Sequence, residues 1–295
     1  MRIAEFASIL KKSGSRITKI GDHYFNLHLR KSYSVPPCNR ITITRKLISI
    51  LRWKYPISVL LTELPQKNTY EFVLETNNYS LDQFSGKVRN RIRKSLKNCR
   101  FMRPSKEELI TEGLEINRQT CIRQGRIAKE LVCKQKWTRI VDALYSHEDI
   151  HIQGAYYHER MVGYMVVAKI EDKYSMQHVF VDREDSQITS PMNGILYTFV
   201  NEIIKREGKI KISYGLDSIK PLPELNRFKK NMLFNKIPVT RVYIINPLLM
   251  LYYKFVVFRY IAILKRRHID NDRLRSIIRI YHGNRILKRS MGIIK

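Results

Sequence analysis

The strongest constraint on the fold is a change of hydrophobic period near residue 150. Before that point the apolar residues recur at helical spacing, and Ser105 with Glu108 three residues later forms a capping box that starts a helix. After it, three segments alternate between apolar and polar residues and are typical of strands joined by short turns. We therefore predict two helices over residues 105–123 and 134–147, followed by an antiparallel three-stranded meander over residues 150–182.

The rest of the chain adds helices and strands in alternation. A helix is expected from Pro191 to Gly208, since proline suits a first helical turn and glycine suits a helix end. A strand over 209–217, a helix over 221–234 and a last strand over 237–245 follow. With a short strand near Arg100, this order predicts an α+β fold with a mixed sheet.

The charge of the chain is unusual. Lys and Arg number 55 against 26 Asp and Glu, which gives a net charge of +29. Such a chain attracts polyanions: nucleic acid, anionic lipid or phosphorylated small molecules. With 44% hydrophobic residues, wholesale disorder is excluded. The four cysteines form no CxxC pair and the N-terminus lacks a secretory apolar segment, so we expect a reduced, cytoplasmic protein.

Two segments concentrate the basic residues. Residues 83–106 hold nine basic and no acidic residues, and Val88, Ile92 and Leu96 predict one apolar stripe on a helix. This helix is either solvated or faces a phosphate-bearing ligand. The tail Leu248–Arg267 is too charged to span a bilayer and predicts an amphipathic basic helix. Its apolar side either packs on the folded domain or docks peripherally on an anionic membrane.

Several short motifs together resemble one family. The segments RNRIRKSLKNCRF, EINRQTCIRQGR, GAYYHERMVGYMVV, ISYGLDSI and LNRFKKNMLFNKIPV are similar to the FemAB-like branch of the GNAT acyltransferase superfamily, over residues 80–245. The resemblance implies a GNAT-like mixed, mostly antiparallel sheet flanked by helices. It also implies a truncated N-terminal GNAT-like unit (1–80) and a FemAB-like acyltransferase domain (81–245). The remaining residues, 246–295, form the basic amphipathic helical tail that their charge and spacing predict.

The resemblance implies acyl transfer. An acyl group would pass from acyl-coenzyme A, or an aminoacyl group from aminoacyl-tRNA, to an amine or hydroxyl of a cell-envelope or glycan precursor. The acceptor would be anionic and nucleotide- or lipid-linked, no cofactor would be tightly bound, and the enzyme would be cytoplasmic, with peripheral contact to the inner membrane face. The alternative is a non-catalytic protein on the same scaffold that binds nucleic acid or anionic lipid, which the net charge favours.

In this family the donor carbonyl is polarised where two strands splay apart, here residues 174–182 and 209–214. The donor pyrophosphate of coenzyme-A enzymes binds at the start of the next helix, which points to Ser190, Asn193 and Gly194 as donor-binding residues. This loop departs from the coenzyme-A pattern, because it has one glycine and Pro191 lacks an N–H. The departure weakens coenzyme A as the donor and is compatible with the FemAB branch.

Three further residues are candidates for the chemistry. Asp217 follows a strand end and could take the proton of an acceptor ammonium as the catalytic base, or could simply cap a turn. Lys229 matches the lysine of the family's Phe-Lys pair and could bind an acceptor phosphate or carboxylate, or be a solvated lysine. Tyr214 ends the strand beside the expected cleft, as a substrate-binding residue or an ordinary core tyrosine.

One motif suggests a metal but lacks its context. Residues 147–151 read HEDIH, the HExxH pattern of zinc proteases, which requires both histidines on one helix. The period changes to that of a strand near Ile150, so we predict no metal site.

Overall fold

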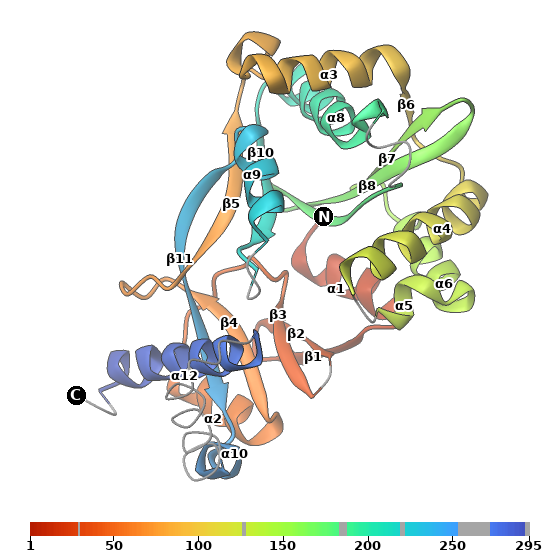
Figure 1. Ribbon diagram of the computed structural model, residues 1–295. Coiled ribbons are helices and arrows are strands. Elements are labelled where there is room, and N and C mark those ends of the chain that lie inside the picture. Colours follow the sequence, from red (N-terminus) through yellow and green to blue (C-terminus); the bar gives the residue numbers. More distant parts are fainter. Residues whose placement is uncertain (29, 126–127, 183–187, 219–221, 253–271, 293–295) are drawn as a thin grey trace. The chain divides into compact units, whose positions relative to one another are not determined.

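The computed structural model describes residues 1–292 except 29, 126–127, 183–187, 219–221 and 253–271 (Figure 1). The chain folds as two compact units, each made of segments distant in sequence. The larger unit comprises Met1–Ser15, Phe72–Gly215 and Arg227–Asn235, and the smaller comprises Arg16–Glu71, Leu216–Asn226 and Lys236–Lys295. These two compact units differ from the three segments 1–80, 81–245 and 246–295 that the family resemblance and the tail suggest. That division stays a prediction.

The larger unit is built on a mixed sheet in the order β5-β10-β9-β8-β7-β6. Its strands are β5 (Thr69–Thr76), β6 (Arg100–Met102), β7 (Ile150–Tyr157), β8 (Arg160–Ile170), β9 (Lys173–Val181) and β10 (Ile210–Leu216). Strands β6 to β9 run antiparallel, whereas β10 runs parallel to β9. The predicted meander is confirmed. His158 and Glu159 both have positive φ, as a two-residue hairpin turn requires.

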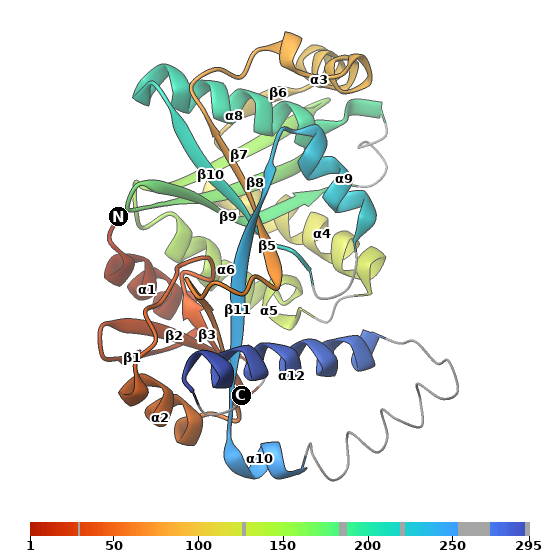
Figure 2. The ribbon, with the colours of Figure 1, turned by 90° about the vertical axis from the view of Figure 1, so that its left-hand side faces the viewer.

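Helices lie on both faces of this sheet (Figure 2). Helix α8 packs on β7 and β8, and α3 packs on α8; α4 covers the opposite face, with α5 and α6 against it and α1 against α6. The helices are α1 (Ile3–Lys12), a short 3-10 turn η1 (Leu81–Gln83), α3 (Gly86–Asn98), α4 (Lys106–Gln124), α5 (Lys129–Val132), α6 (Lys134–Leu144), α8 (Pro191–Glu207) and α9 (Pro223–Asn231). Together these elements form the α+β architecture that the sequence predicts.

Helix α4 begins and ends where its sequence signals place it. The Ser105 hydroxyl accepts from the Glu108 N–H at 3.1 Å, and the Glu108 carboxylate accepts from the Ser105 N–H at 2.6 Å. Gly125 ends the helix in the left-handed conformation, with φ of 58°. Both predicted helix ends are confirmed. They could be predicted from the sequence because hydrogen bonds between residues close in the chain determine them.

The structure corrects the predicted apolar stripe of α3. Val88 and Ile92 are buried, but Leu96 is 39% exposed and Ser95 is buried in its place. Seven residues from Val88 to Ser95 complete about two helical turns, whereas Leu96 is rotated beyond that face. Ser95 lies against Gly194 of α8, where space is short. The small residue is therefore required by the partner helix.

The smaller unit contains five strands and has its own core. The sheet order is β1-β2-β3-β4-β11, with β3 and β4 parallel and the other pairs antiparallel. Apolar side chains of α2, β4 and β11 form its core with residues of α12. Its elements are β1 (Arg16–Ile20), β2 (His23–His28), β3 (Lys31–Val35), α2 (Arg45–Lys54), β4 (Ile57–Thr62), β11 (Asn235–Ile245), α10 (Pro247–Tyr252) and α12 (Asp272–Ser290).

Two further expectations concern the membrane and metal. Most of the predicted amphipathic tail Leu248–Arg267 lies outside the described residues, and only Leu248–Tyr252 of it is seen, in α10. Among the helices that the structure describes, none combines the length and the apolarity needed to cross a bilayer. His147 lies in the loop between α6 and β7, and His151 lies in β7, so the two imidazoles share no helix face. Over the same described residues, no group of three metal-ligating side chains gathers.

Candidate functional site

The candidate site begins where β9 and β10 separate. The two parallel strands pair only at Tyr174 with Ile212 and at Ser175 with Ser213, although both strands are described to their ends. Just beyond, β9 has a bulge: Val166 of β8 pairs with His178, and Val167 pairs with Met176, so Gln177 is the extra residue. A bulge bends a strand and increases its twist. The edge of β9 beyond Ser175 is therefore released from β10, as the family resemblance predicts for residues 174–182 and 209–214.

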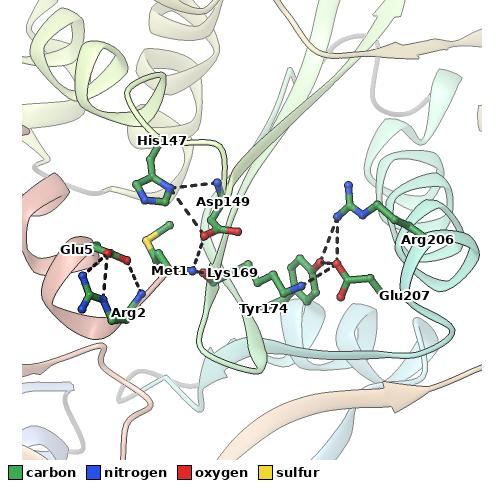
Figure 3. Close-up of polar contacts among 9 residues, drawn as sticks. All are labelled: Met1, Arg2, Glu5, His147, Asp149, Lys169, Tyr174, Arg206 and Glu207. Carbon is green, nitrogen blue, oxygen red and sulfur yellow. Dashed lines mark hydrogen bonds and ion pairs between the residues drawn. The ribbon is translucent and has the colours of Figure 1, made fainter.

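The closed end of this splay is held by a polar cluster (Figure 3). Glu207, at the end of α8, accepts from Lys169 Nζ at 2.8 Å, from the Tyr174 hydroxyl at 2.6 Å and from Arg206 Nη2 at 3.3 Å. Burial alone would raise the pKa of Glu207, but the hydrogen bonds from Lys169 and Tyr174 hold that pKa below its usual value. The carboxylate thus stays charged and ties β8, β9 and α8 together where the strands meet.

A second cluster in Figure 3 fixes the start of the chain in the larger unit. The Met1 ammonium donates to the Asp149 carboxylate and, at 3.0 Å, to the Lys169 carbonyl oxygen. Arg2 and Glu5 complete a capping box at the start of α1. These contacts lie at the start of β7 and the end of β8, beside the β8–β9 turn, and have a structural role, since none of the predicted site residues takes part in them.

At the open end, the structure brings Tyr214 and Lys229 together. Tyr214 follows the last residue of β10 that pairs with β9, and its ring makes edge contacts with Phe228 and Phe234. Lys229 of α9 is only 3% exposed, and its Nζ lies 4.3 Å from the ring centre of Phe72 and 4.8 Å from that of Tyr214. Lys229 is therefore a buried cation against aromatic faces, not a solvated helix lysine. Burial raises the pKa of Tyr214, so its phenol stays protonated.

The three predicted donor-binding residues differ in what they face. Asn193 is buried, and its Nδ2 lies 3.2 Å from the Met232 sulfur. A Cβ on Gly194 would lie 2.3 Å from the Phe101 ring, so this glycine serves the close packing of α8. Ser190 is the N-cap residue, with φ of 50°, and is partly exposed. Of the three, Ser190 alone has a side chain placed to meet a ligand in solution.

Asp217 belongs to the smaller unit, unlike the other predicted site residues. Its N–H donates to the Tyr70 carbonyl at 2.8 Å, and its Oδ1 accepts from Asn226 Nδ2 at 3.1 Å. Its carbonyl oxygen accepts from Arg241 Nη2 at 3.3 Å. The half-buried carboxylate is thus oriented by one side-chain donor, which suits either a capping residue or a positioned base.

Sequence reasoning missed two residues, one in each unit. Phe72 forms one wall around Lys229, and nothing in a strand phenylalanine marks that role. Arg241 is buried within β11, and the available signal was a cation inside the otherwise apolar run VTRVYII. A cation at such a position calls for a partner.

Comparison with known proteins supports the fold. No protein-family model matches the chain, and no curated protein sequence matches it significantly. Among solved structures, FemX is similar with a TM-score of 0.60 and 11% identity, over 85% of this chain and 93% of FemX. The C-terminal domain of a putative lysylphosphatidylglycerol synthetase from Agrobacterium fabrum has a TM-score of 0.52 and 6% identity, over 81% of this chain and 86% of that one.

A third similar structure is L-PGS from Bacillus licheniformis, with a TM-score of 0.50 and 12% identity, over 80% of this chain and 86% of that one. At these identities the likeness concerns the fold. The chain has the FemAB-like GNAT fold that the sequence motifs suggested.

Proposed function

We propose that this protein is an acyltransferase that moves an acyl or aminoacyl group onto an amine or hydroxyl of an anionic cell-envelope or glycan precursor. The observation that carries the proposal is the separation of β9 from β10 at a bulge, within a fold similar to that of FemX. A released strand edge presents backbone N–H groups that can polarise a donor carbonyl. Such groups are fixed before the reaction, which is what makes them effective.

The reaction forms one bond and breaks another. The acceptor amine attacks the donor carbonyl carbon, and the bond from that carbon to the leaving oxygen or sulfur breaks. The leaving atom keeps the bonding electron pair and takes a proton from solvent, so the donor is released as a free hydroxyl or thiol. Asp217 as the base for the proton that the attacking nitrogen loses stays a prediction from the sequence, because Asp217 belongs to the smaller unit. The neutral phenol of Tyr214 is available as a hydrogen-bond donor, and the buried charge of Lys229 stabilises negative charge on the substrate.

The start of α8 supports an aminoacyl ester over a coenzyme A thioester as the donor. Pro191 offers no N–H, and Asn193 and Gly194 are buried in the core, so this helix end has few free groups for a pyrophosphate. In addition, α3 exposes Lys87, Arg91, Arg93 and Lys97 and contains no acidic residue. Such a face suits the phosphate backbone of tRNA.

Surface residues of the smaller unit support contact with a membrane or a lipid-linked acceptor. Trp53 of α2 is 64% exposed, and α10 exposes Leu248 and Leu251. The Asn246 side chain donates to the Arg52 carbonyl at 3.1 Å, which holds α10 beside α2. Helix α2 also exposes Arg45, Lys46 and Lys54, and such a mixture of exposed apolar and basic side chains suits an anionic interface.

A transfer assay with both donors tests the proposal. The full chain is incubated with labelled acetyl-coenzyme A or with labelled aminoacyl-tRNA, together with extracts of phospholipids and of nucleotide-linked glycan precursors. We expect a labelled acceptor, formed from aminoacyl-tRNA faster than from acetyl-coenzyme A. Lys229→Met should abolish the product, while its exposed neighbour Lys230→Met serves as the matched control. No labelled product with either donor from any extract would refute catalysis.

The exposed cations of α3 favour a second function, nucleic-acid binding without catalysis. In that case tRNA and duplex DNA should bind alike, with a steep salt dependence of about 0.9 in log K per log salt for each phosphate contacted on duplex DNA. Fluorescence anisotropy of Arg91→Gln and Arg93→Gln measures the contribution of this face. Binding that depends on these residues, together with no transfer in the assay above, would select this alternative.

A further inference from the structure

The smaller unit contains a pocket of about 220 Å³ that none of the predicted site residues lines. Its walls come from β11 and α12 and from the segment before β5, and they include Asn68, Arg241, Tyr243, Arg279 and His282. Small-molecule sites usually measure about 300–1,000 Å³. The pocket therefore suits one charged group of a ligand better than a whole cofactor.

The close packing of α12 on β11 creates this pocket. A Cβ on Gly283 would lie 2.5 Å from the Tyr243 ring and 2.8 Å from the Arg241 carbonyl oxygen, so only glycine permits this approach. The next residue, Asn284, donates from Nδ2 to the Tyr243 carbonyl at 2.7 Å. Because Arg279 lies one turn before Gly283, it is held over the same part of the strand as His282.

Arg241 is the unusual residue of the pocket. It is only 8% exposed, and its backbone is fixed by two hydrogen bonds of 2.8 Å to the Asn68 amide. Its Nη2 donates to the Asp217 carbonyl at 3.3 Å, while its buried Nε has no hydrogen-bond partner among the described residues. Buried polar groups in native proteins are almost always paired, and buried charges more so.

Among the described residues, the guanidinium groups of Arg241 and Arg279 donate to backbone carbonyl oxygens and not to carboxylates. Arg279 Nη1 donates to the Ser218 carbonyl at 3.0 Å, next to the Asp217 carbonyl that Arg241 contacts. Within the described part of the chain, neither arginine forms an ion pair. Two arginine side chains with a histidine beside them, and a buried Nε donor without a partner among the described residues, form a site suited to an anion.

We propose that this pocket binds a phosphate group, held by Arg241 and Arg279. The planar guanidinium presents paired donors that match phosphate oxygens, and a phosphate monoester carries close to two negative charges, enough to balance both arginines. His282 adds a third polar group at the pocket wall. That the phosphate belongs to the acceptor rests on the proposed acyl transfer; that the pocket binds phosphate does not.

The two arginines also connect the pocket to the turn that carries Asp217. Each donates to a backbone carbonyl of that turn, at Asp217 and at Ser218. A phosphate held between the guanidinium groups would therefore fix the position of the candidate base through its main chain. The phosphate of a bound acceptor would then contact the same two arginines that hold the turn with Asp217.

Calorimetric titration of the full chain with inorganic pyrophosphate at low salt tests the pocket. We expect saturable binding at one site, weakened about ten-fold or more in Arg279→Gln, because a charge-assisted hydrogen bond is lost. Arg285→Gln, an exposed arginine of the same helix outside the pocket, is the matched control and should change the affinity less than two-fold. Arg279 is exposed, so its substitution leaves the fold intact, which thermal melting without ligand verifies.

Two results would overturn the inference. One is the absence of saturable pyrophosphate binding to the wild-type chain. The other is an equal loss in Arg285→Gln and Arg279→Gln, which would mean diffuse attraction to a basic surface. Arg241→Gln provides a further check: pyrophosphate should raise the melting temperature of the wild-type chain but not that of this variant.

Competition against pyrophosphate identifies the source of the phosphate. Displacement by a soluble nucleoside diphosphate indicates a nucleotide-linked ligand, and displacement by vesicles containing phosphatidate indicates a lipid headgroup. Displacement by neither would overturn a phosphate ester as the ligand. The proposed function and the phosphate pocket can be refuted separately. Pyrophosphate binding that needs Arg279, together with no acyl transfer, would refute the proposed enzyme activity but not the phosphate pocket.

Discussion

Replacing Gly194 by alanine tests whether this glycine at the start of α8 serves close packing of the core or binding of a donor. The added Cβ would lie 2.3 Å from Cζ of Phe101 and 2.4 Å from the Ser95 hydroxyl, where ordinary contacts lie at 3.4–4 Å. Phe101 is part of β6, which is paired to β7, and Ser95 is buried in α3. Neither neighbour can withdraw by about 1 Å without moving its element.

Two effects compete in this variant. Overpacking of a core costs about 1–3 kcal/mol, and contact with both a ring and a hydroxyl favours the upper part of that range. Alanine inside a helix regains about 1 kcal/mol relative to glycine. The free energy of unfolding should therefore fall by roughly 2 kcal/mol in Gly194→Ala.

Urea unfolding monitored by tryptophan fluorescence measures this change. Trp137 is fully buried in the larger unit, so a Trp53→Phe background leaves only its signal. Gly86→Ala is the control, because nothing lies within 4 Å of a Cβ there and its φ is not positive. The control should gain a few tenths of a kcal/mol. If Gly194→Ala were as stable as Gly86→Ala but bound a donor less well, Gly194 would cradle a ligand and the packing argument would be refuted.

Three further predictions follow from the described contacts. Burial lowers the pKa of His178 to about 4. Between about pH 6.5 and 4 the unfolded state therefore binds a proton on this histidine more readily than the folded state does. The free energy of unfolding should fall by roughly 3 kcal/mol as the pH drops through that range. His178→Phe should remove that part of the decline in urea unfolding at pH 7 and pH 4.5, and an unchanged slope would contradict it. Lys229→Met should lose acyl transfer while thermal melting shows a folded chain, whereas Lys230→Met should keep both; equal losses would exclude a specific role for Lys229. Ser105→Ala removes the cap of α4 and should cost about 1 kcal/mol in the same unfolding assay, with no change arguing that Glu108 alone caps the helix.

The amino-acid sequence by itself determined the order of the elements and several of their ends. Ser105 and Gly125 set the limits of α4, and the alternating residues after Ile150 predicted the meander. These features depend on hydrogen bonds and periodicities within a few residues, which a single sequence displays directly. The splay of two strands was expected only through the family resemblance, and the pairing of β9 with β10 bears it out.

The tertiary structure decided what surrounds each candidate residue. Lys229 lies against Phe72, from a strand more than 150 positions away, and Gly194 faces Phe101 and Ser95 from two other elements. The smaller unit pairs β4 with β11, so residues near both chain ends share one sheet.

Arg241 shows the same dependence on distant segments. Its pocket exists only because α12 packs on β11 at Gly283. Whether a lysine is solvated or buried, or an arginine paired or unpaired, depends on residues brought together by folding. Local sequence patterns contain no information about these tertiary contacts. The sequence could therefore indicate candidate residues but could not predict which residues surround them.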